Sequence, residues 1–355
     1  MATLKPAARS TVKKRTKKVR VQLLCHEDLV PKESIEGLSD AEISEWRAEF
    51  DVWTALRDIG YDVQVLGVPD DVEAIRKGVL EFRPDVLFNL TTEFHGAAHY
   101  DQHVVSYLEL LKQNYTGCNP QGMTLARDKD LSKKILKHDG VPVPAFARFV
   151  HGRVVDLPPH LKYPLFIKSA VEEASLGISL DSIVHSDKQL EDRVLYIHEE
   201  ICTDAIAEEY IDGREFYIGV LGNDRLKTFP LWELCIPKLP KGQPLIATRR
   251  IKWDVKYQQK LGVQNKRAEG LSTKLEREIS AAAKQAYRSL GLSGYARLDL
   301  RLRPDNTYYF LEANPNPDIT YGEDFAESAE ADGVSYEELI DRIVKLGRSY
   351  DAGWK

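Results

Sequence analysis

The first 120 residues alternate between short apolar runs and longer stretches in which apolar residues recur at helical spacing. The apolar runs, at residues 19–25, 61–68 and 84–90, are expected to form strands. Residues 39–60 and 73–82 have the periodicity of amphipathic helices. Strands that alternate with helices form parallel sheets with crossover helices. The pattern therefore predicts an N-terminal α/β unit that ends near residue 120.

The pattern changes in the rest of the chain. Two apolar runs, at residues 205–211 and 215–221, flank Asp212 and Gly213, a pair typical of β-hairpin turns. Residues 231–270 are polar and irregular, as is typical of a functional lid or binding loop. We predict α/β and α+β structure in four segments: a basic disordered tail (1–20), an N-terminal α/β domain (21–120), a central subdomain (121–204) and a C-terminal subdomain (205–355).

A further hairpin is predicted where two apolar-rich runs flank the turn-forming residues 304–306. A turn about residues 305 and 306 pairs Asp299 with Glu312 and Arg297 with Asn314. Side chains two residues apart share a face of a strand, so these four should project together. The same face is expected to carry three aromatic residues: Tyr295, Tyr308 and Phe310.

This hairpin face is the first candidate for chemistry. Directly paired side chains lie ~5 Å apart at Cβ, and two carboxylates at that distance repel unless they are compensated. A hard divalent cation such as Mg²⁺, bound together with a substrate phosphate, would compensate them. The alternative is a polar face in contact with water, which the aromatic residues on the same face argue against. The hairpin therefore indicates a metal–phosphate site.

Composition adds an uneven distribution of charge. The formal net charge is −6, but residues 1–20 carry eight Lys or Arg and no acidic residue, which leaves −14 for the remainder. Such a tail can bind nucleic acid or act as a localisation signal, although we favour a disordered extension. The acidic remainder argues against binding to a phosphate backbone. Without a signal-peptide pattern, a membrane-span run or metal-spaced cysteines, we expect a cytoplasmic protein with no membrane or nucleic-acid partner.

Other residues could supply contacts to phosphate. The loops GxxxxGK[ST] and GxGxxG do not occur, but Lys168 ends an apolar strand and small residues follow within 172–177. Glu208 and Glu209 are adjacent on a predicted strand, so one of them must face inward and needs a partner. Three histidines recur at helical spacing, which is more typical of surface or core histidines than of a metal triad: His95, His99 and His103.

Together these motifs resemble the ATP-grasp superfamily and, within it, the D-alanine–D-alanine ligase group. The resemblance spans nearly the whole chain from Val21, and its pieces are residues 95–96, 115–117, 128–129, 167–168, 208–216 and 294–317. It implies an ATP-grasp fold with an N-terminal parallel-sheet (pre-ATP-grasp) domain, and ATP between the central and C-terminal subdomains. It also implies ATP-dependent joining of a carboxylate to an amine through an acyl phosphate.

The resemblance implies contacts to the nucleotide. Lys129 and Lys168 would hold the α- and β-phosphates, and the loop around Ser175 and Gly177 would close over them. The remaining contacts would be made to the adenine amino group by Glu208, to the ring edge by the backbone of Glu209 and Ile211, and to the ribose by Glu215.

The resemblance also implies roles in the chemistry. Lys256 would lie near the γ-phosphate, with Tyr257 beside it approaching Ser175. Arg297 would stabilise the acyl phosphate and the tetrahedral intermediate. Two Mg²⁺ ions, for which Mn²⁺ is an alternative, would be bound by Asp299, Glu312 and Asn314.

Three departures from the D-alanine ligases concern the loop and the substrates. The second serine of the family's phosphate loop is replaced here by Leu176. The family's N-terminal glutamate for a substrate amine has no clear match, and Glu27 or Asp28 stand nearest. Where the family has a glycine and then a serine that helps hold the second substrate's carboxylate, this chain has Asp318 and Glu323.

Two acids at that place would repel a carboxylate. We therefore expect an amine substrate that either lacks a carboxylate there or carries positive charge, and not D-alanine. The candidate substrate residues are His95, Asp318 and Glu323.

The expected cofactors are ATP and Mg²⁺, and the expected partners are a small-molecule or peptide carboxylate and an amine. The resemblance also suggests a homodimer formed through the N-terminal unit. Two other functions stay open: a phosphotransferase that acts on a hydroxyl or a histidine, and a non-catalytic ATP-binding protein. Arg297 favours the ligase, because acyl-phosphate chemistry requires it and a simple kinase does not. The complete set of metal ligands with Lys168 argues against a non-catalytic relic.

Overall fold

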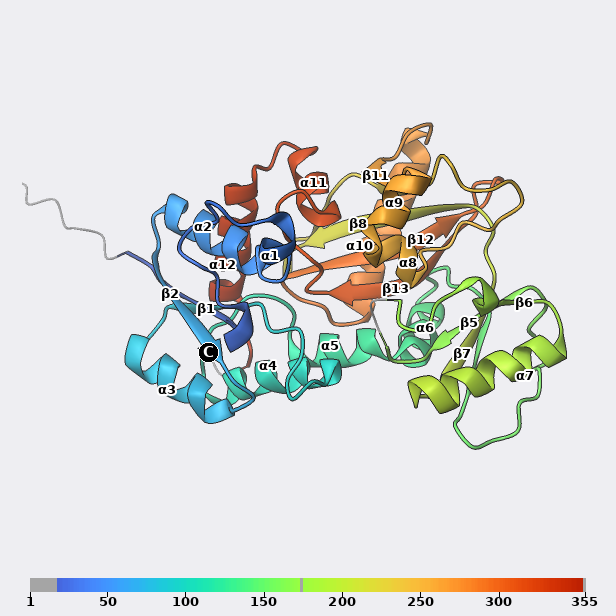
Figure 1. Ribbon diagram of the computed structural model, residues 1–355, viewed down its shortest axis with the longest axis horizontal. Coiled ribbons are helices and arrows are strands. Elements are labelled where there is room, and N and C mark those ends of the chain that lie inside the picture. The colour runs from blue at the N-terminus through green and yellow to red at the C-terminus, as the bar shows by residue number, and fades with distance from the viewer. Residues whose placement is uncertain (1–17, 173–174, 354–355) are drawn as a thin grey trace, which may run out of the picture.

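The computed structural model describes residues 18–172 and 175–353. The predicted basic tail thus lies almost entirely outside the described residues. Figure 1 shows three sheets: a blue parallel sheet at one end of the molecule, a green sheet at the other, and a large yellow-to-red sheet above the green one. Within the described ranges, no helix combines the length and apolar character needed to cross a membrane.

The N-terminal sheet is parallel, as the alternating pattern predicts, with strand order β2-β1-β3. The strands are β1 (Arg20–His26), β2 (Asp62–Val68) and β3 (Val86–Asn89). Their helices are α1 (Asp40–Ser44), α2 (Arg47–Ile59), α3 (Val72–Phe82) and α4 (Asp101–Leu110). Ser39 begins α1 with a capping box to Glu42, and Gly60 ends α2 in the left-handed conformation.

The central sheet is antiparallel, with strand order β4-β7-β5-β6. Its strands are β4 (Phe146–Phe149), β5 (Leu165–Ser169), β6 (Ile183–Val184) and β7 (Ala205–Glu209). The associated helices are α5 (Pro120–Arg127), α6 (Lys129–His138) and α7 (Asp187–Tyr196). Short 3-10 segments lie at Glu27–Leu29, Ala98–Tyr100 and Leu180–Ser182, and a π-helical turn at Ile197–Ile201.

The C-terminal sheet has the order β11-β10-β8-β12-β13, with β9 paired to β8. Its strands are β8 (Arg214–Leu221), β9 (Lys227–Thr228), β10 (Trp232–Cys235), β11 (Gln264–Arg267), β12 (Tyr295–Leu302) and β13 (Tyr308–Pro315). The helices are α8 (Arg249–Trp253), α9 (Val255–Leu261), α10 (Thr273–Ser289), α11 (Asp324–Glu330) and α12 (Tyr336–Ser349). The prediction that residues 231–270 are irregular is therefore wrong in part, because this segment contains two strands and two short helices.

The predicted hairpin at Asp212 and Gly213 is also wrong. β7 pairs with β4 and β5, whereas β8 pairs with β10 and β12, so the chain passes from one sheet to the other at this point. A Cβ atom on Gly213 would lie 2.1 Å from the carbonyl oxygen of Leu302. Glycine is required there because the crossing chain runs directly against the β12 end, and not because it closes a two-residue turn.

The hairpin of β12 and β13 has the predicted pairs, Asp299 with Glu312 and Arg297 with Asn314. Its turn is longer than predicted: Arg303 donates its N–H to the Thr307 carbonyl, and Asn306 has φ 67°. A three-residue turn with a left-handed last residue is a common hairpin geometry. The pairing beyond Asp299 is restored by a β-bulge.

Because of the bulge, the predicted face of two aromatic residues, Tyr308 and Phe310, is wrong. Leu300 pairs with Phe310 and Leu302 with Tyr308, so Leu311 is the extra residue. Phe310 consequently lies on the face opposite Glu312 and is buried in the core. Of the acidic pair, Asp299 is buried, and Glu312 is half-buried beside Lys129 and Lys168 of the central subdomain.

The last helix of the chain packs on the first sheet. Leu339, Ile340, Ile343 and Val344 of α12 are buried in one apolar cluster with residues of β1, β3 and α2. Figure 1 shows the red α12 beside the blue α2. The N-terminal core is therefore completed by residues from the opposite end of the sequence.

Candidate active site

A cavity lies between the central and C-terminal sheets, on either side of the β7–β8 crossing. Its walls come from β5, β7, residues 210–215, the segment 246–252 and the β12–β13 hairpin. The polar and charged side chains on it are Lys168, Ser175, Glu208, Glu209, Tyr210, Glu215, Lys252, Asp299, Arg301 and Glu312. Eight of the seventeen site residues predicted from the sequence line this cavity: Lys168, Ser175, Glu208, Glu209, Ile211, Glu215, Asp299 and Glu312.

The hairpin carboxylates occupy one wall, and their pKa values are shifted in opposite directions. Burial raises the pKa of Asp299 more than the guanidinium of Arg297 lowers it. Burial would also raise the pKa of Glu312, but Lys168, Lys129 and other lysines reverse the sign and hold it well below its usual range. These lysines thus place an excess of positive charge opposite an ionised Glu312.

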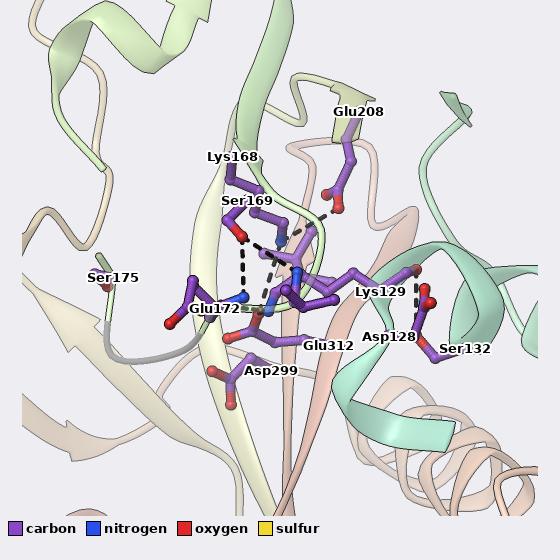
Figure 2. Close-up of polar contacts among 12 residues, drawn as sticks. Asp128, Lys129, Ser132, Lys168, Ser169, Glu172, Ser175, Glu208, Asp299 and Glu312 are labelled. Atoms are coloured by element: carbon purple, nitrogen blue, oxygen red, sulfur yellow. Dashed lines mark hydrogen bonds and ion pairs between the residues drawn. The ribbon is translucent and has the colours of Figure 1, made fainter. Parts of the chain in front are cut away.

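Two lysines from the central subdomain supply much of that charge. Lys168 lies between two carboxylates, with its Nζ 3.2 Å from Glu208 Oε1 and 3.7 Å from Glu312 Oε2, as Figure 2 shows. Lys129, the first residue of α6, lies 3.9 Å from Glu312 Oε2 and donates to the Glu172 carbonyl at 2.7 Å. Asp128 caps α6 and so fixes where that lysine begins the helix. Both cations are positioned to accept an anion between the sheets.

The adjacent acids of β7 behave as the strand alternation predicts. Glu208 is buried and contacts lysines, whereas Glu209 pairs with Arg303 at 2.6 Å nearer the surface. The backbone N–H of Glu209 donates to the Ala145 carbonyl, and the Ile211 carbonyl accepts from Arg301 at 2.9 Å. Glu208, Glu209 and Ile211 therefore line the cavity where the chain passes from the central sheet to the C-terminal sheet.

Glu215 lies on the same wall and is held by two neighbours. Arg301 donates to its Oε2 at 2.7 Å, and the Tyr217 hydroxyl donates to its Oε1 at 3.1 Å. Arg301 is therefore a cavity residue that sequence reasoning missed. Its position two residues after Asp299 on β12, on the same face of the strand, was the available signal.

The loop after β5 reaches across the cavity, and the predicted residues 173–174 lie outside the described part of the chain. Ser175 has φ 59° and its hydroxyl donates to the Ala247 carbonyl at 3.0 Å. Gly177 does not line the cavity, but its carbonyl accepts a hydrogen bond from buried Arg193. The loop is thus tied both to the facing segment 246–252 and to α7.

Lys252 lines the cavity, and Lys256 does not. Lys252 is on α8, and its charge acts on both Asp299 and Glu312. Lys256 is exposed on α9, and Tyr257 packs beneath the guanidinium of Arg250, 4.1 Å from the ring centroid. The two lysines are four residues apart on consecutive short helices. The sequence alone therefore does not show which of them faces the cavity.

Arg297 grips the hairpin carboxylate beside it. Its Nε and Nη2 donate to the two oxygens of Asp299 at 2.8 and 3.0 Å, and Nη1 lies 3.9 Å from Asp324. Asn314, its partner across the hairpin, has a buried side-chain nitrogen without a hydrogen-bond partner in the described structure. Two carboxylates and an amide oxygen are the donor set that Mg²⁺ prefers, so these residues fit the ion that the family implies.

The segment after the hairpin gathers acidic residues near α2. Asp51 accepts the N–H of Tyr321 at 3.1 Å, which joins α2 to residues 318–324. Glu49 is 5% exposed, and burial together with repulsion from Asp318 raises its pKa to about 7. Desolvation and repulsion by Asp318 raise the pKa of Glu323 to about 7. The acidic residues predicted near the substrate, Asp318 and Glu323, are therefore joined by two that were not predicted, Glu49 and Asp51.

Glu49 was missed although the sequence held a signal. It falls on the apolar stripe of its helix, three residues after Trp46 and three before Val52. Glu27 and Asp28, the acids that stand nearest to a match for the family's N-terminal glutamate, are exposed. His95 is also outside the cavity, with its Nδ1 3.7 Å from Asp70 and its side chain 59% exposed. The other two histidines of the helical series contact the ring of Tyr100 in edge-on or tilted geometry instead of converging on an ion: His99 and His103.

Comparison with known proteins accounts for this arrangement. The family model described as D-ala D-ala ligase C-terminus matches residues 135–345. The D-alanine–D-alanine ligase of Methylibium petroleiphilum is 30% identical over 308 residues, covering 85% of this chain and 90% of that protein. The ligase of the same name from Carboxydothermus hydrogenoformans is 28% identical over 320 residues, covering 88% and 96%.

A solved structure agrees with the fold. The D-alanine–D-alanine ligase from Bacillus anthracis, complexed with ATP, superposes with a TM-score of 0.71 at 21% identity, covering 93% of this chain and 97% of that one. Two sheets that face each other across a cavity, with a parallel α/β unit before them, are thus the ATP-grasp arrangement, and the class of enzyme is the ATP-grasp carboxylate–amine ligase. Because the family model covers more than half of the 355 residues, the chain belongs to the D-alanine–D-alanine ligase family.

Proposed function

We propose that this protein is an ATP-dependent ligase that activates a substrate carboxylate as an acyl phosphate and joins it to an amine other than D-alanine. The observation that carries the proposal is the hairpin itself. It presents Asp299 and Glu312 to a cavity whose opposite wall holds Lys168, and Arg297 is hydrogen-bonded to Asp299. A group suited to stabilising an acyl oxyanion thus lies beside groups suited to binding a triphosphate.

The proposed reaction has two steps. An oxygen of the substrate carboxylate attacks the γ-phosphorus of ATP, the bond to the β–γ bridging oxygen breaks, and ADP leaves. The amine nitrogen then attacks the acyl carbon, the carbon–oxygen bond to phosphate breaks with its electron pair on phosphate, and the nitrogen loses a proton. The products are an amide, ADP and inorganic phosphate.

The residues of the cavity fit roles along the nucleotide. We propose that Lys129 and Lys168 bind the α- and β-phosphates and that Lys252, in place of Lys256, lies by the γ-phosphate. Ser175 and Gly177 would bring their loop over the phosphates and exclude water from the acyl phosphate. For the nucleoside we propose the side chains of Glu208 and Glu215 and the backbone of Glu209 and Ile211.

The hairpin residues fit roles in the chemistry. Asp299, Glu312 and Asn314 would hold Mg²⁺, which supplies charge neutralisation and alignment of the transferred phosphoryl group. Arg297 is permanently charged and bidentate, which suits an oxyanion that develops at the acyl carbon.

The acidic residues support an amine substrate with positive charge. Asp318 and Glu323 stand where the family has a glycine and then a serine that helps hold the second substrate's carboxylate, and Glu49 and Asp51 add two further acidic side chains from α2. A second substrate with its own carboxylate would meet repulsion there, whereas an ammonium group would be attracted.

A substrate screen tests the proposal. The purified protein is incubated with ATP, Mg²⁺ and pooled carboxylates and amines, ADP and phosphate are quantified, and products are identified by mass spectrometry. Release that requires both a carboxylate and an amine, with a cationic amine preferred, is the expected result. Formation of D-alanyl-D-alanine at ordinary ligase rates would contradict it, phosphorylation of a hydroxyl or a histidine would indicate a kinase, and binding without turnover would indicate a non-catalytic protein.

A further inference from the structure

One buried lysine has no place in the roles described above. Lys133, on α6, is 1% exposed and does not line the cavity. The next residue, Lys134, is 62% exposed in its side chain and pairs with Asp130 on the same helix. A lysine is rarely buried to this degree unless a specific partner holds its charge.

The partner of Lys133 is the acid at the adenine end of the cavity. Lys133 Nζ lies 3.2 Å from Glu208 Oε1, and Lys168 Nζ lies 3.2 Å from the same oxygen. Lys133 also donates to the carbonyl of Leu311, the extra residue of the β13 bulge. One buried ammonium therefore links Glu208 on the central sheet to the strand that carries Glu312.

The two lysines differ in what a bound nucleotide would do to them. Lys168 lines the cavity and also faces Glu312, so a triphosphate would attract it away from Glu208. Lys133 lies behind the wall, where phosphate cannot reach it. Lys133 is therefore the cation that stays on Glu208 Oε1, on a carboxylate that itself lines the cavity.

We propose that Lys133 is a positioning residue that orients Glu208 and thereby makes the site select adenine over guanine nucleotides. The inference rests on the proposed function only in taking Glu208 to meet the base. Adenine carries an amino donor at the ring position where guanine carries a carbonyl acceptor. A carboxylate oxygen held toward the cavity can accept from the former and repels the latter, because an unpaired acceptor facing an acceptor is costly.

Burial lowers the pKa of Lys133 to about 8 against the opposing attraction of Glu208, so each ion depends on the other. Without Lys133, the orientation of Glu208 is no longer fixed once Lys168 turns toward phosphate, so the carboxylate can rotate away from the base. The repulsion of the guanine carbonyl is then relieved. Loss of Lys133 should therefore improve the binding of GTP relative to ATP, an effect that general destabilisation does not produce.

The first experiment measures nucleotide binding to the full chain by calorimetry, with Mg²⁺ and without carboxylate or amine. Lys133→Met is compared with Lys134→Met, its exposed neighbour, and thermal unfolding is recorded for both. We expect the ratio of ATP to GTP affinity to fall at least tenfold in Lys133→Met and to stay within twofold in Lys134→Met. An unchanged ratio in a folded Lys133→Met overturns the proposal.

A second pair of variants keeps the test decisive if Lys133→Met does not fold. In Glu208→Gln, Lys133 should hold the amide oxygen and turn the NH₂ group toward the base, so that GTP is preferred. In Lys133→Met with Glu208→Gln, no buried charge is left unpaired between the two positions, and the preference should disappear because the amide can rotate. The same nucleotide preference in both variants overturns the proposal. A wild type that prefers ATP but ligates nothing contradicts the proposed function and leaves this inference standing.

Discussion

At the scale of single residues, Arg297 is held in a fixed orientation before any substrate binds. Its fork is engaged by Asp299, which is itself buried. We expect Arg297→Lys to lower kcat by about a hundredfold and to leave ATP affinity within a few-fold, because a point charge cannot reproduce the bidentate contact. Initial rates of ADP release and an ATP titration measure the two quantities.

The matched control for that change is Arg214→Lys. Arg214 is on the neighbouring strand β8 and pairs with Glu233 away from the cavity, so its replacement should leave kcat nearly unchanged. Equal losses in the two variants would mean that sheet stability and not the oxyanion explains the effect.

The raised pKa of Glu49 makes the stability of the folded protein depend on pH. Its pKa is raised to about 7 in the folded protein, so the folded state binds more protons than the unfolded state between about pH 4.5 and 7. Stability from this group therefore falls as pH rises through that window. We expect Glu49→Gln to stabilise the protein by about 3 kcal/mol at pH 8 and by about 1 kcal/mol at pH 5.5.

Chemical denaturation at the two pH values checks the Glu49 prediction. The exposed Glu45, at the end of α1, supplies the control, because Glu45→Gln should change stability by less than about 0.5 kcal/mol at both. A gain for Glu49→Gln that is the same at pH 5.5 and pH 8 would exclude the ionised carboxylate as its cause.

At the scale of elements, local patterns predicted what local geometry controls. The pairs of the β12–β13 hairpin came out right, because strand alternation and a turn signal determine register together. They came out right despite a wrong turn length, since the bulge at Leu311 added back the residue that the longer turn had displaced. Tyr308 and Phe310 lie between the turn and the bulge, where the register differs by one residue from the predicted one. The face predicted for these two residues was therefore wrong.

Features set by distant contacts could not be predicted. The pair Asp212 and Gly213 satisfies every local rule for a hairpin, but β8 finds partners in β10 and β12, which lie later in the chain. Lys252 and Lys256 cannot be ranked without knowing which short helix turns toward the cavity. Glu49 was predictable in kind, because a charged residue on an apolar helix face signals a buried partner or a site. Lys133 carried no such signal, because three of the four residues three or four positions away on α6 are charged: Lys129, Asp130 and Lys137.

The loop after β5 depends on one side chain of α7. Arg193 is 8% exposed and donates to the Gly177 carbonyl and, at 2.9 Å, to Ser182 Oγ. We expect Arg193→Met to weaken ATP binding about tenfold and to speed proteolysis within residues 175–182, because buried acceptors lose their donor. ATP titration and timed proteolysis measure these effects.

Lys188 provides the comparison for Arg193. It lies on the same helix, is 73% exposed and pairs with Asp192 within that helix. Lys188→Met should leave both ATP affinity and cleavage unchanged. If Arg193→Met weakens ATP binding without faster cleavage, the arginine acts on the nucleotide by charge and not through the loop.

At the scale of the whole molecule, the N-terminal and C-terminal ends share a core. Ile340 of α12 is fully buried among residues that include Val52 and Phe88. We expect Ile340→Ala to destabilise this unit by about 2–5 kcal/mol, the usual cost of such a cavity. Hydrogen exchange should accelerate in β1 and β3 as well as in α12, while amides of β12 change little.

Lys345→Ala tests whether the effect belongs to the core. Lys345 is on the same helix, 66% exposed, and pairs only with Asp341 among the contacts described for it. Its loss should cost less than about 0.5 kcal/mol. Faster exchange confined to α12 in Ile340→Ala would show that the helix is an independent addition.

The position of α12 also has a consequence for biosynthesis. About 250 residues separate β3 from this helix, so at ordinary rates of translation the first sheet leaves the ribosome on the order of ten to fifty seconds before its covering helix. During that interval the face that will receive α12 is open and available to a chaperone. A nascent chain that stalls before α12 keeps that face exposed, so the core of the first domain is completed only after α12 has been synthesised.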